Sequence, residues 1–111
     1  LPALYTVKLA VSNDSDIDAM ESVQLYIAAK DSKVKRPAKE LRGFDKKEIA
    51  AHAKADYTFA LTAEAFSYYD IEKHCYIAPA GTYEILLGSA SDDIRLSRTV
   101  TLSADIMISR S

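Results

Sequence analysis

The chain has 111 residues, of which 49% are hydrophobic and 27% charged. A chain of this size and composition is typical of one globular domain, and it needs no disulfide or metal to hold a core. The formal net charge is −2, from 14 basic and 16 acidic residues, whereas nucleic-acid-binding domains carry a strong basic excess. No apolar run approaches the length that spans a bilayer. We therefore expect neither nucleic acid nor a membrane as partner.

Several short stretches alternate apolar and polar residues with the period of two that is typical of half-buried β-strands. In the second of these stretches, for example, Val23, Leu25 and Ile27 share one face. The expected strands are 5–11, 22–28, 56–61, 82–87 and 98–102, with shorter ones at 40–46, 67–70 and 74–77. Seven or eight such strands, separated mostly by turn-forming residues, predict an all-β fold of two antiparallel sheets packed face to face.

Two segments have some helical character. Residues 48–55 are rich in alanine, and we interpret them as a possible turn of helix. Thr62 is followed by Ala63-Glu64-Ala65-Phe66, which has the pattern of an N-cap and one short turn. Neither segment is long enough to change the all-β class.

A tight turn at Pro79-Ala80-Gly81 leads into the strand at 82–87, and Tyr83 stands two residues before the inward position Ile85. This spacing is typical of a tyrosine corner, in which the hydroxyl bonds back to the upstream backbone. It favours an immunoglobulin-like sandwich, with Tyr83 as a structural residue. The alternative is an ordinary strand tyrosine.

Asp14, Asp16 and Asp18 have the spacing that opens a calcium-binding loop. Such a loop needs Gly at its sixth position and a bidentate Glu at its twelfth, where this chain has Ala19 and Leu25. The pattern fails where its geometry is most demanding, so we predict no metal site.

Nor does the sequence contain a recognisable set of catalytic residues. His74 directly precedes Cys75, and neighbouring residues on a strand point to opposite faces, so His74 is not placed to act as its base. None of the 16 acidic residues stands in a motif that singles out a pair of carboxylates for glycoside hydrolysis. We predict no catalytic residue and no cofactor.

Two charged clusters and three tyrosines leave alternatives open. The acidic cluster is Asp14, Asp16, Asp18 and Glu21, and the basic one is Lys30, Lys33, Lys35, Arg36, Lys39 and Arg42. Each is either a solvated loop or part of a docking face. Tyr68 and Tyr69 point to opposite faces of their strand, so one is expected in the core and the other exposed. An exposed Tyr, together with Tyr76, is a candidate platform for carbohydrate.

Five motifs follow one another along the chain: SVQLYI at 22–27, RPAKELRGF at 36–44, YTFALT at 57–62, FSYYD at 66–70 and PAGTYEILLGSASDDIRL at 79–96. In kind and order they resemble the VVQLYV, RPxKELKGF, VxFxL, LSxYD and PGxYxIxVGxSSxDIRL motifs of the fibronectin type III-like domain of family 3 glycoside hydrolases, which include β-glucosidases and β-xylosidases. The resemblance runs from about Tyr5 to Leu102. Two turns depart from it, because Asn13-Asp14-Ser15 and Ala51-His52-Ala53-Lys54 lack the glycines of the family's NTG and PGE.

The resemblance implies that residues 1–111 form a single fibronectin type III-like module excised from a larger enzyme acting on β-linked glycosides. In that family the nucleophile and acid lie on other domains, which the module packs on and stabilises, and it sometimes lends a loop near the substrate entrance. We expect the catalytic domains of the same chain as partners, and nominate as contacts Lys39, Glu40, Leu41, Phe44, Tyr68 and Tyr69. Alternatively, Leu41 and Phe44 fill the module's own core. A carbohydrate-binding module and a cell-surface adhesion sandwich remain alternative functions, and the compartment stays open.

Overall fold

The computed structural model describes residues 2–30, 36, 38–90 and 93–108. In this part of the chain the strands are β1 (Tyr5–Ser12), β2 (Ala19–Ala29), β3 (Glu40–Ile49), β4 (Lys54–Leu61), β5 (Tyr68–Asp70), β6 (Cys75–Ala78), β7 (Gly81–Ala90), β8 (Asp93–Leu102) and β9 (Ile106–Ile108). A single 3-10 helix, η1, covers Ala63–Phe66. The predicted all-β class is confirmed. Lys33 and Lys35 of the basic cluster lie outside the described residues.

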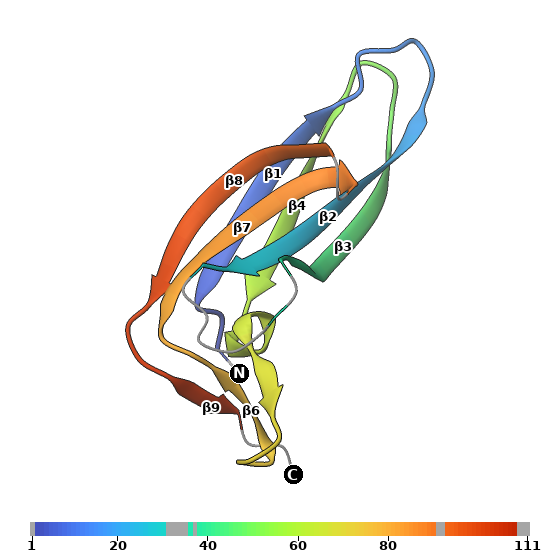
Figure 1. The fold of residues 1–111 in the computed structure, drawn as a ribbon. Helices are drawn as coiled ribbons and strands as arrows, with labels where there is room; N and C mark the ends of the chain where they lie inside the picture. Colours follow the sequence, from blue (N-terminus) through green and yellow to red (C-terminus); the bar gives the residue numbers. More distant parts are fainter. Residues whose placement is uncertain (1, 31–35, 37, 91–92, 109–111) are drawn as a thin grey trace.

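The strands form three antiparallel sheets (Figure 1). A four-stranded sheet has the order β3-β2-β7-β8, and a two-stranded sheet, β1-β4, lies behind it. The third sheet, β5-β6-β9, extends from one end of this sandwich, next to η1. The molecule is therefore elongated, with principal extents of 55 × 28 × 21 Å.

The core lies mainly between the four-stranded sheet and the β1-β4 sheet, and the alternation seen in the sequence determines which residues enter it. Along β1, half-buried and exposed residues alternate without exception. The largest side chains in the core are almost fully buried: Tyr57, Phe66, Leu25, Ile49, Ile85 and Leu87. Burying each of them contributes on the order of 1.5–3 kcal/mol, which makes these inward faces the main source of stability.

A bulge in β3 displaces one residue from the pairing with β2. Leu25 pairs with Gly43 and Tyr26 pairs with Leu41, so Arg42 is the extra residue. Gly43 faces inward at this point: a Cβ atom there would lie 3.0 Å from Cδ1 of Phe59 and 3.2 Å from Cβ of Leu25. The glycine thus allows β3 to approach the opposite sheet closely.

The prediction of a possible helical turn at residues 48–55 is wrong. The segment contains the end of β3, a tight turn and the beginning of β4. Ile49 is 2% exposed and continues the inward face of β3, and the amide of Asn13 donates to the carbonyl of Ala53 at 2.8 Å. Tertiary packing of this kind overrides the weak helix preference of alanine. The turn at 62–66 is confirmed as η1, although the side chain of Thr62 makes no capping bond.

Two side chains hold the loops at the far end of the sandwich together. Asn13, which is 7% exposed, donates to the carbonyl oxygens of Ile17 at 2.8 Å and Ile49 at 2.9 Å. His52 adopts a φ of 59°, a left-handed conformation that favours glycine, and its Nε2 lies 2.6 Å from the carboxylate of Asp16. The acidic loop is therefore tied to the turn between β3 and β4, and a histidine occupies the turn where the resemblance leads one to expect glycine.

Tyr83 lies at the start of β7 with its ring in the core, 5.0 Å from the ring of Phe66. Its hydroxyl donates to the carbonyl oxygen of Pro79 at 2.7 Å. Gly81, between them, has a φ of 139°, which side chains rarely permit. The tyrosine thus fixes the turn that precedes its own strand.

Candidate inter-domain surface

An apolar stripe runs across the outer face of the four-stranded sheet, at its β3 edge. Leu41 is 53% and Phe44 57% exposed, and they pair across the strands with Tyr26 and Gln24. The ammonium of Lys39 lies 5.4 Å from the ring centroid of Tyr26. We call this set, Gln24, Tyr26, Lys39, Leu41 and Phe44, the β3 face. Since Leu41 and Phe44 are exposed, the alternative that they fill the module's own core is excluded.

Glu40 belongs to an internal charge network rather than to the β3 face. Its carboxylate binds Arg36 at 3.1 Å and Arg42 at 2.7 Å. Both guanidinium groups also donate to the carbonyl oxygen of Ser67, and Arg36 donates to that of Phe66 as well. The side chain of Arg36 is only 5% exposed. The network therefore fastens the start of β3 to the end of η1, where backbone carbonyls need donors.

The two neighbouring tyrosines of β5 have different surroundings. Tyr68 is half-buried, and the guanidinium of Arg36 lies 5.4 Å from its ring centroid. Tyr69 is 47% exposed and packs edge-on against Tyr76 of β6, with ring centroids 5.1 Å apart. Tyr68 is thus part of the internal network, and Tyr69 lies on the small sheet at the end of the molecule.

The six nominated residues consequently occupy three places. Lys39, Leu41 and Phe44 lie together on the β3 face, Glu40 and Tyr68 surround Arg36, and Tyr69 stands apart. Sequence reasoning missed Tyr26 as a member of the face and Arg36 as a buried residue. The signal for Tyr26 was present, because it alternates with the inward residues Leu25 and Ile27.

The described part of the chain shows no grouping of three His, Cys, Asp or Glu side chains of the kind that holds a metal ion. His74 is exposed, with a φ of 52°, and Cys75 is half-buried. The same part of the chain has no helix with the length and apolar character needed to cross a membrane.

Two tyrosine hydroxyls have perturbed acidity, both for structural reasons. Burial raises the pKa of Tyr83 above its ordinary value, against the opposing effect of Arg36. Burial also raises the pKa of Tyr57, and the carboxylates of Glu21 and Asp45 add to the effect. Each hydroxyl donates to a backbone carbonyl, that of Pro79 for Tyr83 and that of Glu21 for Tyr57. These hydroxyls therefore serve as hydrogen-bond donors within the fold.

Residues 21–91 match the sequence profile of the fibronectin type III-like domain. This chain belongs to that family. A probable β-glucosidase L of Emericella nidulans is 38% identical over 97 residues, which cover 87% of this chain and 13% of the relative. An exo-α-(1→6)-L-arabinopyranosidase of Bifidobacterium breve is 37% identical over 100 residues, 90% of this chain and 13% of the relative.

Solved structures agree with this fibronectin type III-like fold. The β-glucosidase of Kluyveromyces marxianus in complex with glucose superposes with a TM-score of 0.87 at 30% identity, over 93% of this chain and 12% of that one. A family 3 (GH3) β-glucosidase of Bifidobacterium adolescentis gives 0.84 at 39% identity, over 87% and 14%. The resemblance to family 3 glycoside hydrolases is confirmed, and the domain spans about an eighth of the length of these relatives.

Proposed function

We propose that this fibronectin type III-like domain is a non-catalytic accessory module of a β-glucosidase-like enzyme, and that its β3 face packs against the catalytic part of the same chain. The proposal rests on the large share of the relatives' length that lies outside the matched region. It rests equally on the exposure of Leu41 and Phe44, which form with Tyr26 an apolar patch on the outer face of the four-stranded sheet.

The geometry favours this face for docking over the other nominated residues. Interface centres are enriched in aromatic side chains and depleted in charges, and Tyr26, Phe44 and Leu41 provide such a centre. Lys39 lies at its rim, where a charge is solvated and costs little. Glu40 supports the face from within, because its network fixes the start of β3.

The test uses the full-length enzyme with Phe44→Ser, compared with Met107→Ser as the matched control. Met107 is 63% exposed and lies on β9, away from the β3 face. We expect Phe44→Ser to release the domain and to accelerate its limited proteolysis, while Met107→Ser behaves like the wild type. Equal proteolysis of both variants contradicts docking through this face. Turnover of an aryl β-glucoside by residues 1–111 alone contradicts the non-catalytic role.

A second candidate, carbohydrate binding, is favoured by the exposed ring of Tyr69, which Tyr76 holds edge-on. A ring supported in this way presents a face on which a sugar stacks. Titration with a panel of glucans and xylans tests it, because binding perturbs the signals of Tyr69 and Tyr76, and unchanged spectra eliminate this candidate.

A further inference from the structure

Asn13-Asp14-Ser15 is a sequon for N-glycosylation, and Asn13 is the only asparagine in the chain. A sequon that carries glycan lies on a surface loop, because the attached carbohydrate is bulky and hydrated. Asp14, Ser15 and Asp16 are indeed exposed, whereas Asn13 is only 7% exposed. The residue that would carry the glycan is therefore buried within an otherwise exposed loop.

Both polar atoms of the Asn13 side chain are engaged within the fold. The Nδ2 atom carries two hydrogens and donates to two carbonyl oxygens, that of Ile17 at 2.8 Å and that of Ile49 at 2.9 Å. The Oδ1 atom accepts from the backbone N–H of Ser15 at 3.0 Å. The hydroxyl of Ser15, which the sequon requires, lies 2.7 Å from this Oδ1 and 2.9 Å from the carbonyl oxygen of Ile17. The loop thus encloses both groups that a glycosylating enzyme must reach.

Glycosylation replaces one of the two hydrogens on Nδ2 with a sugar carbon. The bond between C1 of the sugar and a lipid diphosphate breaks, the diphosphate leaves with the bonding electrons, and the Nδ2 proton passes to a base of the transferase. A single C–N bond is about 1.45 Å long, so a C1 atom placed along either hydrogen bond would lie about 1.4 Å from the accepting oxygen. Two atoms that are not bonded cannot approach so closely. A glycosylated Asn13 must therefore leave its native position.

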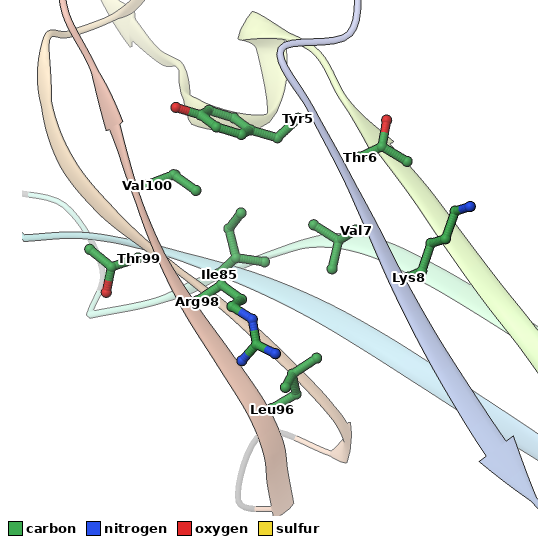
Figure 2. Close-up of a pocket in the computed structure, with 9 residues that line it drawn as sticks. All are labelled: Tyr5, Thr6, Val7, Lys8, Ile85, Leu96, Arg98, Thr99 and Val100. Carbon is green, nitrogen blue, oxygen red and sulfur yellow. The ribbon is translucent and has the colours of Figure 1, made fainter.

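The side of the sandwich between β1 and β8 is open, whereas the end that carries Asn13 is tied together. Figure 2 shows Val7 and Leu96 among the residues that line the open side, where a groove of about 310 Å³ lies between the two sheets. Asn13 follows β1, and its backbone N–H donates to the carbonyl of Ala53 while its Nδ2 donates to that of Ile49 at the end of β3. These two bonds join the sheets at the point where a glycan on Asn13 would have to fit.

The order of synthesis leaves Asn13 without its partners at first. Ile49 follows it by 36 residues, so the buried bond between them cannot form until that later segment has been made. At a synthesis rate of about 5–20 residues per second, this interval lasts about 2–7 s. During this time the sequon is part of an unfolded chain, and the amide of Asn13 is accessible.

We propose that Asn13 is an acceptor for an N-linked oligosaccharide only while the chain is unfolded, and that glycosylation of Asn13 and native packing of its loop exclude one another. The donor is an oligosaccharide linked to a lipid diphosphate. If the loop closes first, both N–H groups of the amide are bound to Ile17 and Ile49 and no transfer occurs. If transfer comes first, the amide can no longer make both bonds, and the junction between β1 and β3 does not form. This inference goes beyond the accessory role and is independent of the β3 face.

The first test offers the site in both states to a purified oligosaccharyltransferase with its lipid-diphosphate-linked donor. A synthetic peptide of residues 9–19 represents the unfolded chain, and the native full-length enzyme represents the folded one. Mass spectrometry of the fragment that contains Asn13 measures the modification, and the peptide with Asn13→Gln is the blank. We expect the peptide to be glycosylated at least about tenfold faster than the native enzyme. An unmodified wild-type peptide overturns the proposal, and so do equal rates for the two substrates.

The second test follows the competition during synthesis, with the full-length enzyme directed into the secretory pathway of yeast. We expect Asn13 to be unmodified in the secreted, active enzyme and glycosylated in part of the chains that the cell retains. Ser15→Thr keeps the hydroxyl and makes a stronger acceptor, so it should increase the retained, glycosylated fraction. The same variant made in the cytosol, where no transferase acts, is the control and should give as much active enzyme as the wild type.

The wild type alone decides the outcome of this second test. A glycan on Asn13 of the secreted, active enzyme overturns the proposal, because the fold would then tolerate the modification. Retained chains that all lack the glycan overturn it as well, because Asn13 would then be no acceptor. Neither measurement involves Phe44 or Leu41, so either result leaves the docking proposal unchanged.

Discussion

Gly43 faces Phe59 of the opposite sheet, and the space for a side chain there is also limited by a rigid atom of the neighbouring strand β2. The ring of Phe59 can rotate away from an added methyl group, but the Cβ of Leu25, at 3.2 Å, is fixed to its backbone. A substituent at position 43 must therefore move a strand. This contact explains why the KELRGF segment carries a glycine inside a strand, where glycine is otherwise unfavourable.

We expect Gly43→Ala to lower the free energy of unfolding by about 1–3 kcal/mol, because it overpacks the contact between the sheets. Urea denaturation of the chain measures the change. Ser97→Ala, at an exposed position of β8, is the control and should alter the value by less than about 0.5 kcal/mol. An unchanged unfolding midpoint for Gly43→Ala would contradict the close approach.

Asn13→Ala should cost about 1–3 kcal/mol, because it removes the side-chain donor to the carbonyl oxygen of Ile49 in a buried position, and one of the two donors to that of Ile17, which keeps the hydroxyl of Ser15. Asp14→Ala changes the neighbouring, exposed residue and is expected to be nearly neutral. The two variants are compared by thermal unfolding. Equal midpoints would show that the loop does not depend on the amide of Asn13.

The buried tyrosines predict a loss of stability in alkali. Because the folded-state pKa values of Tyr83 and Tyr57 are raised, the folded protein holds these protons more tightly than the unfolded chain. Their contribution is complete below the ordinary tyrosine pKa of 10.0 and is lost as the pH rises through the higher folded values. Tyr83→Phe should lower the free energy of unfolding at neutral pH by about 1 kcal/mol. In the variant this free energy should also decline less steeply with pH above pH 10. A steeper slope in the variant would contradict this account.

At the scale of elements, alternation predicted the strands and their inward faces because each sheet is buried on one side only. The same rule failed where an element is too short to show a period, as in Ile106–Ile108, which was not predicted. The prediction of a helical turn at 48–55 rested on alanine content and failed for another reason: burial of Ile49 on the inward face stabilises a strand there. The burial of Arg36 depends on carbonyls about 30 residues away, which no local pattern reveals.

The charge network of Arg36, Glu40 and Arg42 joins β3 to η1. We expect it to stabilise the fold chiefly because the guanidinium of Arg36, whose side chain is only 5% exposed, needs the carboxylate of Glu40. Glu40→Gln keeps the shape of the side chain but leaves Arg36 and Arg42 without their shared carboxylate, so we expect a loss of about 2 kcal/mol. Glu48→Gln, at an exposed position of the same strand, is the matched control. Denaturant unfolding compares them, and equal stabilities would show that the bonds to Phe66 and Ser67 suffice alone.

At the scale of the whole molecule, the sandwich is asymmetric, with four strands facing two. One edge of the large sheet carries the β3 face, and the other borders the groove beside β1. The sequence predicted Leu41 and Phe44 as contacts through the resemblance of their motif. The groove depends on which strands lack neighbours, and that becomes visible only once the strand order is known.

The most direct test of the docking account is carbene footprinting of the wild-type full-length enzyme, read at single residues. Phe44 and Met107 are exposed to similar extents in this domain, 57% and 63%, so they form a matched pair. The account predicts that Phe44 and Leu41 are protected from labelling while Met107 is labelled. Labelling of Phe44 as strong as that of Met107 would contradict it.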